Sequence, residues 1–83
     1  MTLDGYSSTD NVAVGFSALK SSYITQRNVA IGSLADYGST TADDNTVVGY
    51  AALGPNNTGS DNVVVGGYAM DANTSGGDNT AVG

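Results

Sequence analysis

The stretch whose residue types come closest to a chemical site is an oxygen-rich turn, Asp71-Ala72-Asn73-Thr74-Ser75-Gly76. Asp71, Asn73 and Ser75 put oxygen ligands at alternate positions before a glycine, as the opening of a calcium-binding loop does. The twelfth position of such a loop, where a bidentate Glu belongs, is Val82. Turns of this composition produce the pattern readily. We therefore expect no bound metal or cofactor, and these three residues remain the alternative metal site.

The rest of the chain offers little for catalysis. Its 83 residues include no His, Cys or Glu, which removes the usual general bases, thiol nucleophiles and most catalytic metal ligands. Asp43 and Asp44 are adjacent, so on a strand they would point to opposite faces and could not act as an acid–base pair. We predict that the protein is not an enzyme.

Acidic residues outnumber basic ones, with eight Asp against Lys20 and Arg27 and a net charge of -6. This excess disfavours nucleic acid, whose phosphates are bound through Lys and Arg, and it disfavours anionic membranes. No apolar run reaches the roughly 18 to 20 residues of a membrane-spanning helix, so we expect no membrane insertion. The remaining candidates for a binding surface are three tyrosines in turn segments: Tyr6, Tyr23 and Tyr37.

The elements that must position these residues are set by one short phrase that recurs through the chain. It begins with an asparagine (Asn11, Asn28, Asn45, Asn62 and Asn79) and ends with a glycine (Gly15, Gly32, Gly49, Gly66 and Gly83). Successive asparagines are always 17 residues apart. A period this regular indicates small units that stack on copies of themselves, because one such unit cannot bury its apolar face alone.

The whole chain, residues 1–83, is therefore one repeat domain. It divides into a partial repeat at 1–10, full repeats at 11–27, 28–44, 45–61 and 62–78, and a partial repeat at 79–83. Natural stacked arrays normally carry atypical terminal repeats. A chain that starts and stops in mid-repeat is expected to be an excerpt of a longer fibre.

Counting the asparagine as repeat position 1, positions 2 to 4 have the alternation of a short strand that is apolar on both faces. Position 4 holds large apolar residues and is predicted to be the core: Val14, Ile31, Val48, Val65 and Val82. The smaller residues of position 3 are predicted to face neighbouring chains. We expect the asparagines to form an amide ladder between copies, and the glycines to turn the chain at the end of each strand.

Positions 6 to 9 are predicted to form a second short strand, whose large side chains Phe16, Leu34, Tyr50 and Tyr68 help to fill the coil. Positions 10 to 17 are polar and glycine-rich, which predicts outer turns. Aspartates recur at position 17, where we expect them in solvent, with Arg27 relieving repulsion between its neighbours. The fold class is all-β: a parallel β-solenoid with 17-residue coils. The second apolar face of the strand calls for another chain or another layer.

Two families carry similar repeats. Val-Ala-Val-Gly and Val-Ala-Ile-Gly, each after a polar pair (Asp10-Asn11 and Arg27-Asn28), resemble the Asn-Ser-Val-Ala-Ile-Gly repeats of trimeric autotransporter adhesin heads. Asn45-Thr46-Val47-Val48-Gly49-Tyr50-Ala51-Ala52-Leu53 resembles the Asn-Thr-Ala-Val-Gly-Tyr-x-Ala-Leu repeats of phage tail-fibre and tail-fibre-like surface proteins. The resemblance covers nearly the whole chain. It implies a β-roll in which three chains wind around a common axis, projecting from a cell or virion.

The leading hypothesis is a structural and adhesive segment of a phage tail fibre or a bacterial surface adhesin. Such a segment would form a homotrimeric rigid shaft or head on the virion or the cell surface, with a glycan or protein of the host surface as a possible receptor. The alternative hypothesis is an extracellular filament subunit, whose copies stack end to end through uncapped coils.

Overall fold

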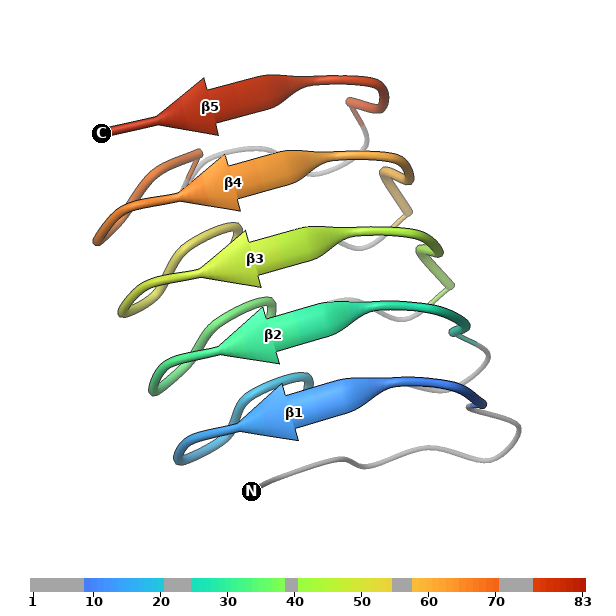
Figure 1. The fold of residues 1–83 in the computed structure, drawn as a ribbon, viewed down its shortest axis with the longest axis horizontal. Helices are drawn as coiled ribbons and strands as arrows, with labels where there is room; N and C mark the ends of the chain where they lie inside the picture. Colours follow the sequence, from blue (N-terminus) through green and yellow to red (C-terminus); the bar gives the residue numbers. More distant parts are fainter. Residues whose placement is uncertain (1–8, 21–24, 39–40, 55–57, 71–75) are drawn as a thin grey trace.

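The protein is a stack of parallel strands with no helix among the residues that the structure describes. The computed structural model describes residues 9–20, 25–38, 41–54, 58–70 and 76–83. Five strands of three residues follow the repeat: β1 (Val12–Val14), β2 (Val29–Ile31), β3 (Thr46–Val48), β4 (Val63–Val65) and β5 (Thr80–Val82). They form one parallel sheet in the order β1-β2-β3-β4-β5 (Figure 1). The predicted parallel β-solenoid is confirmed.

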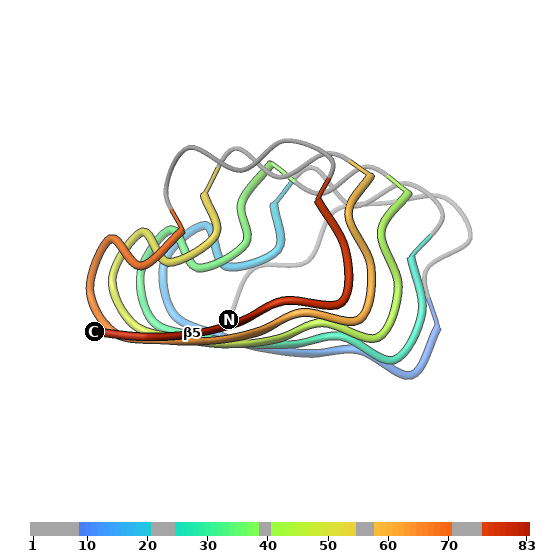
Figure 2. The ribbon, with the colours of Figure 1, turned by 90° about the horizontal axis from the view of Figure 1, so that it is seen from above.

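Each strand pairs with the strand one repeat further along the chain, so like residues lie on like residues. Val12 is level with Val29, and Val47 is level with Val64. The backbone bonds across the sheet are short: Val29 N–H donates to Asn45 O at 2.8 Å, and Gly49 N–H donates to Ile31 O at 2.8 Å. Seen along the stack, the strands superpose on one flat wall of the coil (Figure 2).

The core lies on the opposite side of the strands from the one expected. The residues of position 3 are fully buried in the first four strands: Ala13, Ala30, Val47 and Val64. The residues predicted as core point outward instead, and most of them are well exposed: Val14 51%, Ile31 40%, Val65 38% and Val82 77%, with Val48 partly exposed. Both faces of the strand are apolar, so the alternation alone could not tell inside from outside.

The width of the coil determines which side of each strand faces inward. Its interior is filled by position 3 on the strand wall and, from the far wall, by Leu19, Leu53 and the alanines of position 8, all in one cluster. Because a 17-residue coil encloses so little space, the column that contains alanine in three of its five copies fits inside, and the two columns of Val, Ile and Thr face outward.

The second strand predicted at positions 6 to 9 does not form. In all four repeats the residues at positions 7 and 9 have φ between 50° and 62°, which is the left-handed region rather than an extended conformation. They are Ser17, Leu19, Leu34, Asp36, Ala51, Leu53, Tyr68 and Met70. Backbone hydrogen bonds between coils still hold this wall: Leu19 N–H donates to Ala35 O at 2.9 Å, and Leu53 N–H donates to Ala69 O at 2.9 Å.

This winding turn also places the large side chains of positions 6 and 7 differently from the prediction. Phe16, Tyr50 and Tyr68 are 75%, 50% and 60% exposed, and Leu34 is partly exposed. The prediction that they fill the coil is wrong. The alternation of left-handed residues turns position 9 inward, so Leu19 and Leu53 are the large apolar residues that this wall buries.

The glycine that follows each strand is required by both conformation and space. Gly49 has φ +137°, and a Cβ built there would lie 2.6 Å from the carbonyl oxygen of Gly66 in the next coil. A side chain at this position would force the two coils apart. The glycines are thus the points where successive coils approach each other most closely.

Candidate functional site

Two features could carry function: a set of polar ladders that runs along the stack, and the outward face of the sheet. The first ladder is made by the asparagines. The Oδ1 of Asn28 accepts the backbone N–H of Asn45 at 2.9 Å, and the Oδ1 of Asn45 accepts that of Asn62 at 2.9 Å. Asn28, Asn45 and Asn62 are completely buried.

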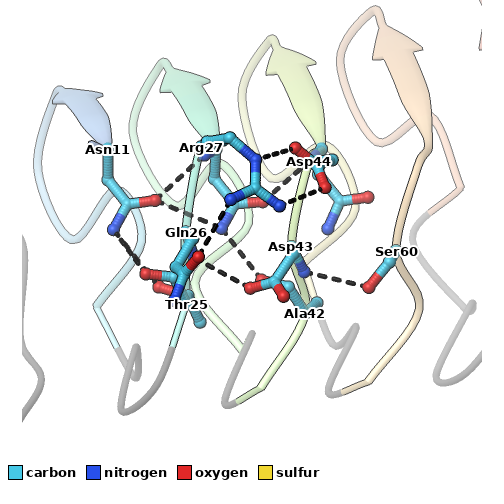
Figure 3. Close-up of polar contacts among 10 residues, drawn as sticks. Asn11, Thr25, Gln26, Arg27, Ala42, Asp43, Asp44 and Ser60 are labelled. Carbon is cyan, nitrogen blue, oxygen red and sulfur yellow. Dashed lines mark hydrogen bonds and ion pairs between the residues drawn. The ribbon is translucent and has the colours of Figure 1, made fainter. Parts of the chain in front are cut away.

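The amide end of each asparagine bonds within its own coil. The Nδ2 of Asn11 donates to Thr25 O at 3.0 Å and that of Asn28 to Ala42 O at 2.9 Å (Figure 3), and that of Asn45 donates to Gly59 O at 2.9 Å. One side chain therefore closes its coil and clamps the coil to the next. A shorter or apolar residue would leave buried backbone groups unsatisfied.

A second ladder, which the sequence reasoning missed, runs through position 16. The backbone N–H of Gln26 donates to Asp43 Oδ1 at 2.8 Å, and the backbone N–H of Asp43 donates to Ser60 Oγ at 2.9 Å (Figure 3). The signal was present in the sequence, because Gln26, Asp43 and Ser60 all offer a side-chain acceptor at the same repeat position. The adjacent pair Asp43 and Asp44 thus acts in cohesion between coils.

Position 17 adopts a left-handed backbone in every described copy: Asp10, Arg27, Asp44, Asp61 and Asp78 have φ between 56° and 62°. Asp tolerates this region better than most residues, which accounts for its recurrence there. Asp10 and Asp61 are exposed, as expected.

Arg27 departs from the aspartate pattern and pairs with the aspartate of the next coil. Its Nε lies 2.6 Å from Asp44 Oδ1 and its Nη2 lies 2.8 Å from Asp44 Oδ2, so the contact is bidentate. The hydrogen bond and charge of Asp44 raise the pKa of Arg27. Conversely, the hydrogen bond from Arg27 lowers the pKa of Asp44 below its ordinary value. The side chains of Arg27 and Asp44 are 54% and 37% exposed, so water screens the pair and it contributes little to stability.

Of the predicted binding and metal residues, the structure describes Tyr37 alone. Asp71, Asn73, Ser75, Tyr6 and Tyr23 lie outside the described residues. Tyr37 is described: it is 39% exposed, and its ring lies so close to Gly54 that a Cβ there would be 2.6 Å from Tyr37 Cε1. Within the described ranges there is no cluster of three or more acidic, His or Cys residues that could hold a metal ion, and no pocket.

The outward side of the sheet is lined by uncharged residues on all five strands. We call it the outer face, and it consists of positions 2 and 4 of the five strands: Val12, Val14, Val29, Ile31, Thr46, Val48, Val63, Val65, Thr80 and Val82. None of these residues is charged, in a chain whose net charge is -6.

Aromatic residues lie at the corner beyond the glycine that ends the strand. The rings of Tyr50 and Tyr68 meet edge to face, with their centroids 5.4 Å apart and their planes at 67°. Both are exposed, as is Phe16, which lies two coils before Tyr50. A broad apolar surface of this kind can bind another flat surface.

No family model, curated protein or solved structure matches the chain. Among the described residues no helix is long and apolar enough to span a bilayer. The case for function is therefore made by the ladders and the outer face.

Proposed function

We propose that the chain is a structural and adhesive fibre segment, of the kind found in phage tail fibres or bacterial surface adhesins, and that it works as a homotrimer. The observation that carries the proposal is the outer face. One coil buries only the inner side of its strands, while the outer side presents two columns of β-branched side chains to solvent on five successive levels.

The energetics favour covering this face. Removing a half-exposed valine from water is worth on the order of 1 kcal/mol, and the outer face offers about ten β-branched side chains per copy. Association costs several kcal/mol in lost freedom of motion, so a face of this size covered in three copies leaves a net gain. Like-charged chains repel each other, and the absence of charge from the outer face lets them meet where that repulsion is smallest.

The interior of the chain supports a mechanical role. Buried asparagine ladders and backbone bonds link every coil to the next, which makes the stack stiff along its axis. The resemblance of the repeats to tail-fibre and adhesin phrases supports a place on a virion or a cell surface. Attachment to a glycan or protein of the host surface would then involve the turn segments that the stack holds out to solvent.

Sedimentation of the wild-type chain and of Val65→Asp tests the proposal. The wild type should sediment as a trimer at micromolar concentration, and Val65→Asp should sediment as a monomer because it places a carboxylate in the middle of the outer face. Thr58→Asp adds the same charge at an exposed turn residue and should stay trimeric. A wild-type chain that is folded and monomeric at that concentration would contradict the proposal.

A second candidate is a filament subunit whose copies stack end to end. The observation that favours it is the regular parallel register, with like residues level with like residues from strand to strand, which the strands of a further copy could continue. An unpaired strand edge is a template for another chain. Negative-stain images distinguish the two: this candidate predicts fibres with a repeat near one protomer height, and the trimer predicts short uniform particles.

A further inference from the structure

Two exposed tyrosines of successive coils meet at the corner that follows the strand-ending glycine. The ring centroids of Tyr50 and Tyr68 are 5.4 Å apart and the ring planes are at 67°, so the edge of one ring points at the other. The rings lie outside both the core and the outer face, and they are 50% and 60% exposed. Neither ring fills the coil, so the pair is accessible to reagents in solution.

The backbone holds the two rings together. Tyr68 N–H donates to Tyr50 O at 2.8 Å, which fixes the two residues on adjacent coils. Gly67 occupies the same repeat position as Tyr50 in the next coil, and it has no side chain that could separate the rings. The pairing is thus a consequence of the stacking, because the two tyrosines come from different repeats.

The same corner of the earlier coils has a similar backbone but lacks the phenols. Leu34 N–H donates to Phe16 O at 2.8 Å, as Tyr68 N–H does to Tyr50 O. Phe16 and Leu34 have no hydroxyl group, and Leu34 is the large corner residue of the coil before Tyr50. Among the described corners, neighbouring phenols therefore occur only between coils 45–61 and 62–78.

We propose that Tyr50 and Tyr68 are an oxidative cross-linking site. A one-electron oxidant of the class formed by a peroxidase with hydrogen peroxide joins the two rings through a carbon–carbon bond. The bond staples coil 45–61 to coil 62–78. Both phenols belong to one chain, so the inference does not depend on the proposed trimer.

The reaction balances with one hydrogen peroxide for each new bond. Each phenol gives one electron and one proton to the oxidant and becomes a phenoxyl radical, whose unpaired electron is shared with the Cε atoms of the ring. A Cε atom of Tyr50 then bonds to a Cε atom of Tyr68. The hydrogen on each bonded Cε leaves as a proton and each phenolic oxygen takes one up, which restores both phenols. The two electrons and two protons taken from the rings reduce hydrogen peroxide to two water molecules.

The geometry favours coupling between these two rings. The new bond needs the Cε edges of both rings to face each other, and the observed arrangement already turns one edge toward the partner. The second ring needs a rotation about its Cβ–Cγ bond, which exposed side chains make within picoseconds to nanoseconds. Rings held this close have an effective concentration in the millimolar range, so at micromolar protein this coupling should exceed coupling between separate chains by on the order of a hundredfold.

Treatment of the purified chain with a haem peroxidase and hydrogen peroxide, followed by peptide mapping, tests the inference. Cleavage on the N-terminal side of aspartate separates all five tyrosines, because the fragments 4–9, 10–35, 36–42, 44–60 and 61–70 carry one each. In the wild type we expect fragments 44–60 and 61–70 to appear as one linked species that has lost two hydrogen atoms. On denaturing electrophoresis the linked product should keep the mass of a single chain.

Conservative variants identify the two rings. Tyr50→Phe and Tyr68→Phe each keep a ring at the corner and remove one phenol, so the linked fragment pair should be absent from both. Tyr37→Phe is the matched control, because it removes the phenol of an exposed tyrosine away from this corner and should leave the yield of the linked pair unchanged. Circular dichroism before oxidation checks that each variant has the fold of the wild type.

The bond should also stabilise the stack, since a link between two coils restricts the unfolded chain. The oxidised wild type should melt at a higher temperature than the untreated chain, whereas peroxidase treatment should not raise the melting temperature of Tyr68→Phe. Fragments 44–60 and 61–70 that stay unlinked after treatment, or a linked product that joins two chains, would overturn the inference. A linked chain that melts no higher than the untreated one would overturn the stapling role.

Discussion

The inner and outer sides of the same five strands differ in burial, and their residue types alone do not predict this difference. Inward, Ala13, Ala30, Val47 and Val64 are fully buried in a narrow coil. Outward, the larger residues of positions 2 and 4 stay partly or largely exposed. The inner side accounts for the fold of one chain. The outer side is apolar beyond what the fold of one chain requires, and the proposed trimer would cover it.

The strongest test of this comparison places one charge on either side of β4. Val64→Asp puts a carboxylate into the buried coil, and we expect a loss of more than about 3 kcal/mol in the free energy of unfolding. Val65→Asp puts it on the outer face, where it should disrupt association while leaving the fold of the chain intact. Denaturant unfolding followed by circular dichroism measures both.

The two variants should also differ in how stability depends on protein concentration. Association stabilises the folded chain by mass action, so the melting temperature of the wild type should rise with concentration. Val65→Asp should abolish that rise, and Val64→Asp should be destabilised at every concentration. Equal losses in the two variants at all concentrations would mean that the two sides of the wall are not distinct.

Close approach of the coils can be tested at two equivalent glycines. Gly49→Ala places a methyl 2.6 Å from the carbonyl oxygen of Gly66 at a φ of +137°, and it should cost roughly 3 kcal/mol through contact and backbone strain. Gly83→Ala has a similar φ of +122° but no atom within 4 Å of the new methyl, so it should cost only the backbone strain, about 1 kcal/mol. Thermal unfolding of the two variants separates strain from contact, and similar losses would show that contact between coils is unimportant.

The buried ladder can be compared between the middle of the stack and its last level. Asn45→Ala removes the acceptor of Asn62 N–H and the donor to Gly59 O, both at 2.9 Å, and should cost about 2 to 3 kcal/mol. Asn79→Ala makes the same change at an exposed asparagine and should cost under about 0.5 kcal/mol. Hydrogen exchange of the Asn62 amide should accelerate in Asn45→Ala alone. Unchanged protection there would argue against the ladder.

The smallest effect is expected outside the coil, at the ion pair between Arg27 and Asp44. Arg27 lowers the pKa of Asp44, chiefly through its hydrogen bond, so the folded state binds a proton at this carboxylate less readily than the unfolded state does. The contribution of the pair is therefore complete above the ordinary Asp pKa of about 4, and it is lost as the pH falls through the lower folded value.

Asp44→Asn should consequently be slightly less stable than the wild type near neutral pH, and the difference should disappear in acid. Asn tolerates the left-handed backbone at this position, so the comparison isolates the charge. Asp61→Asn, at the same repeat position outside this ion pair, is the control for losing a carboxylate. Melting temperatures across pH measure the effect, and a difference that does not shrink as the pH falls below the ordinary Asp pKa would assign it to something other than the ion pair.

The repeat itself determined much of the architecture. Because 17 residues return the chain to the same place, the strands must stack in parallel with like residues on like residues, as Val12 and Val29 do. The roles of Gly49 and Asn45 could also be predicted from the sequence, since one residue type alone recurs at each of their positions. Glycine permits a turn with positive φ, and the asparagine amide can form hydrogen bonds in two directions.

Only the tertiary structure decided which side of the strand is inside. A period of two separates position 3 from positions 2 and 4, but when both sides are apolar it cannot predict which side is buried. The narrow cross-section of the coil places the alanine-containing column, position 3, inside. The far wall was settled in the same way. Leu19 and Leu53 reach the interior because left-handed turns replace an extended strand, and no local propensity of these residues predicts such a backbone.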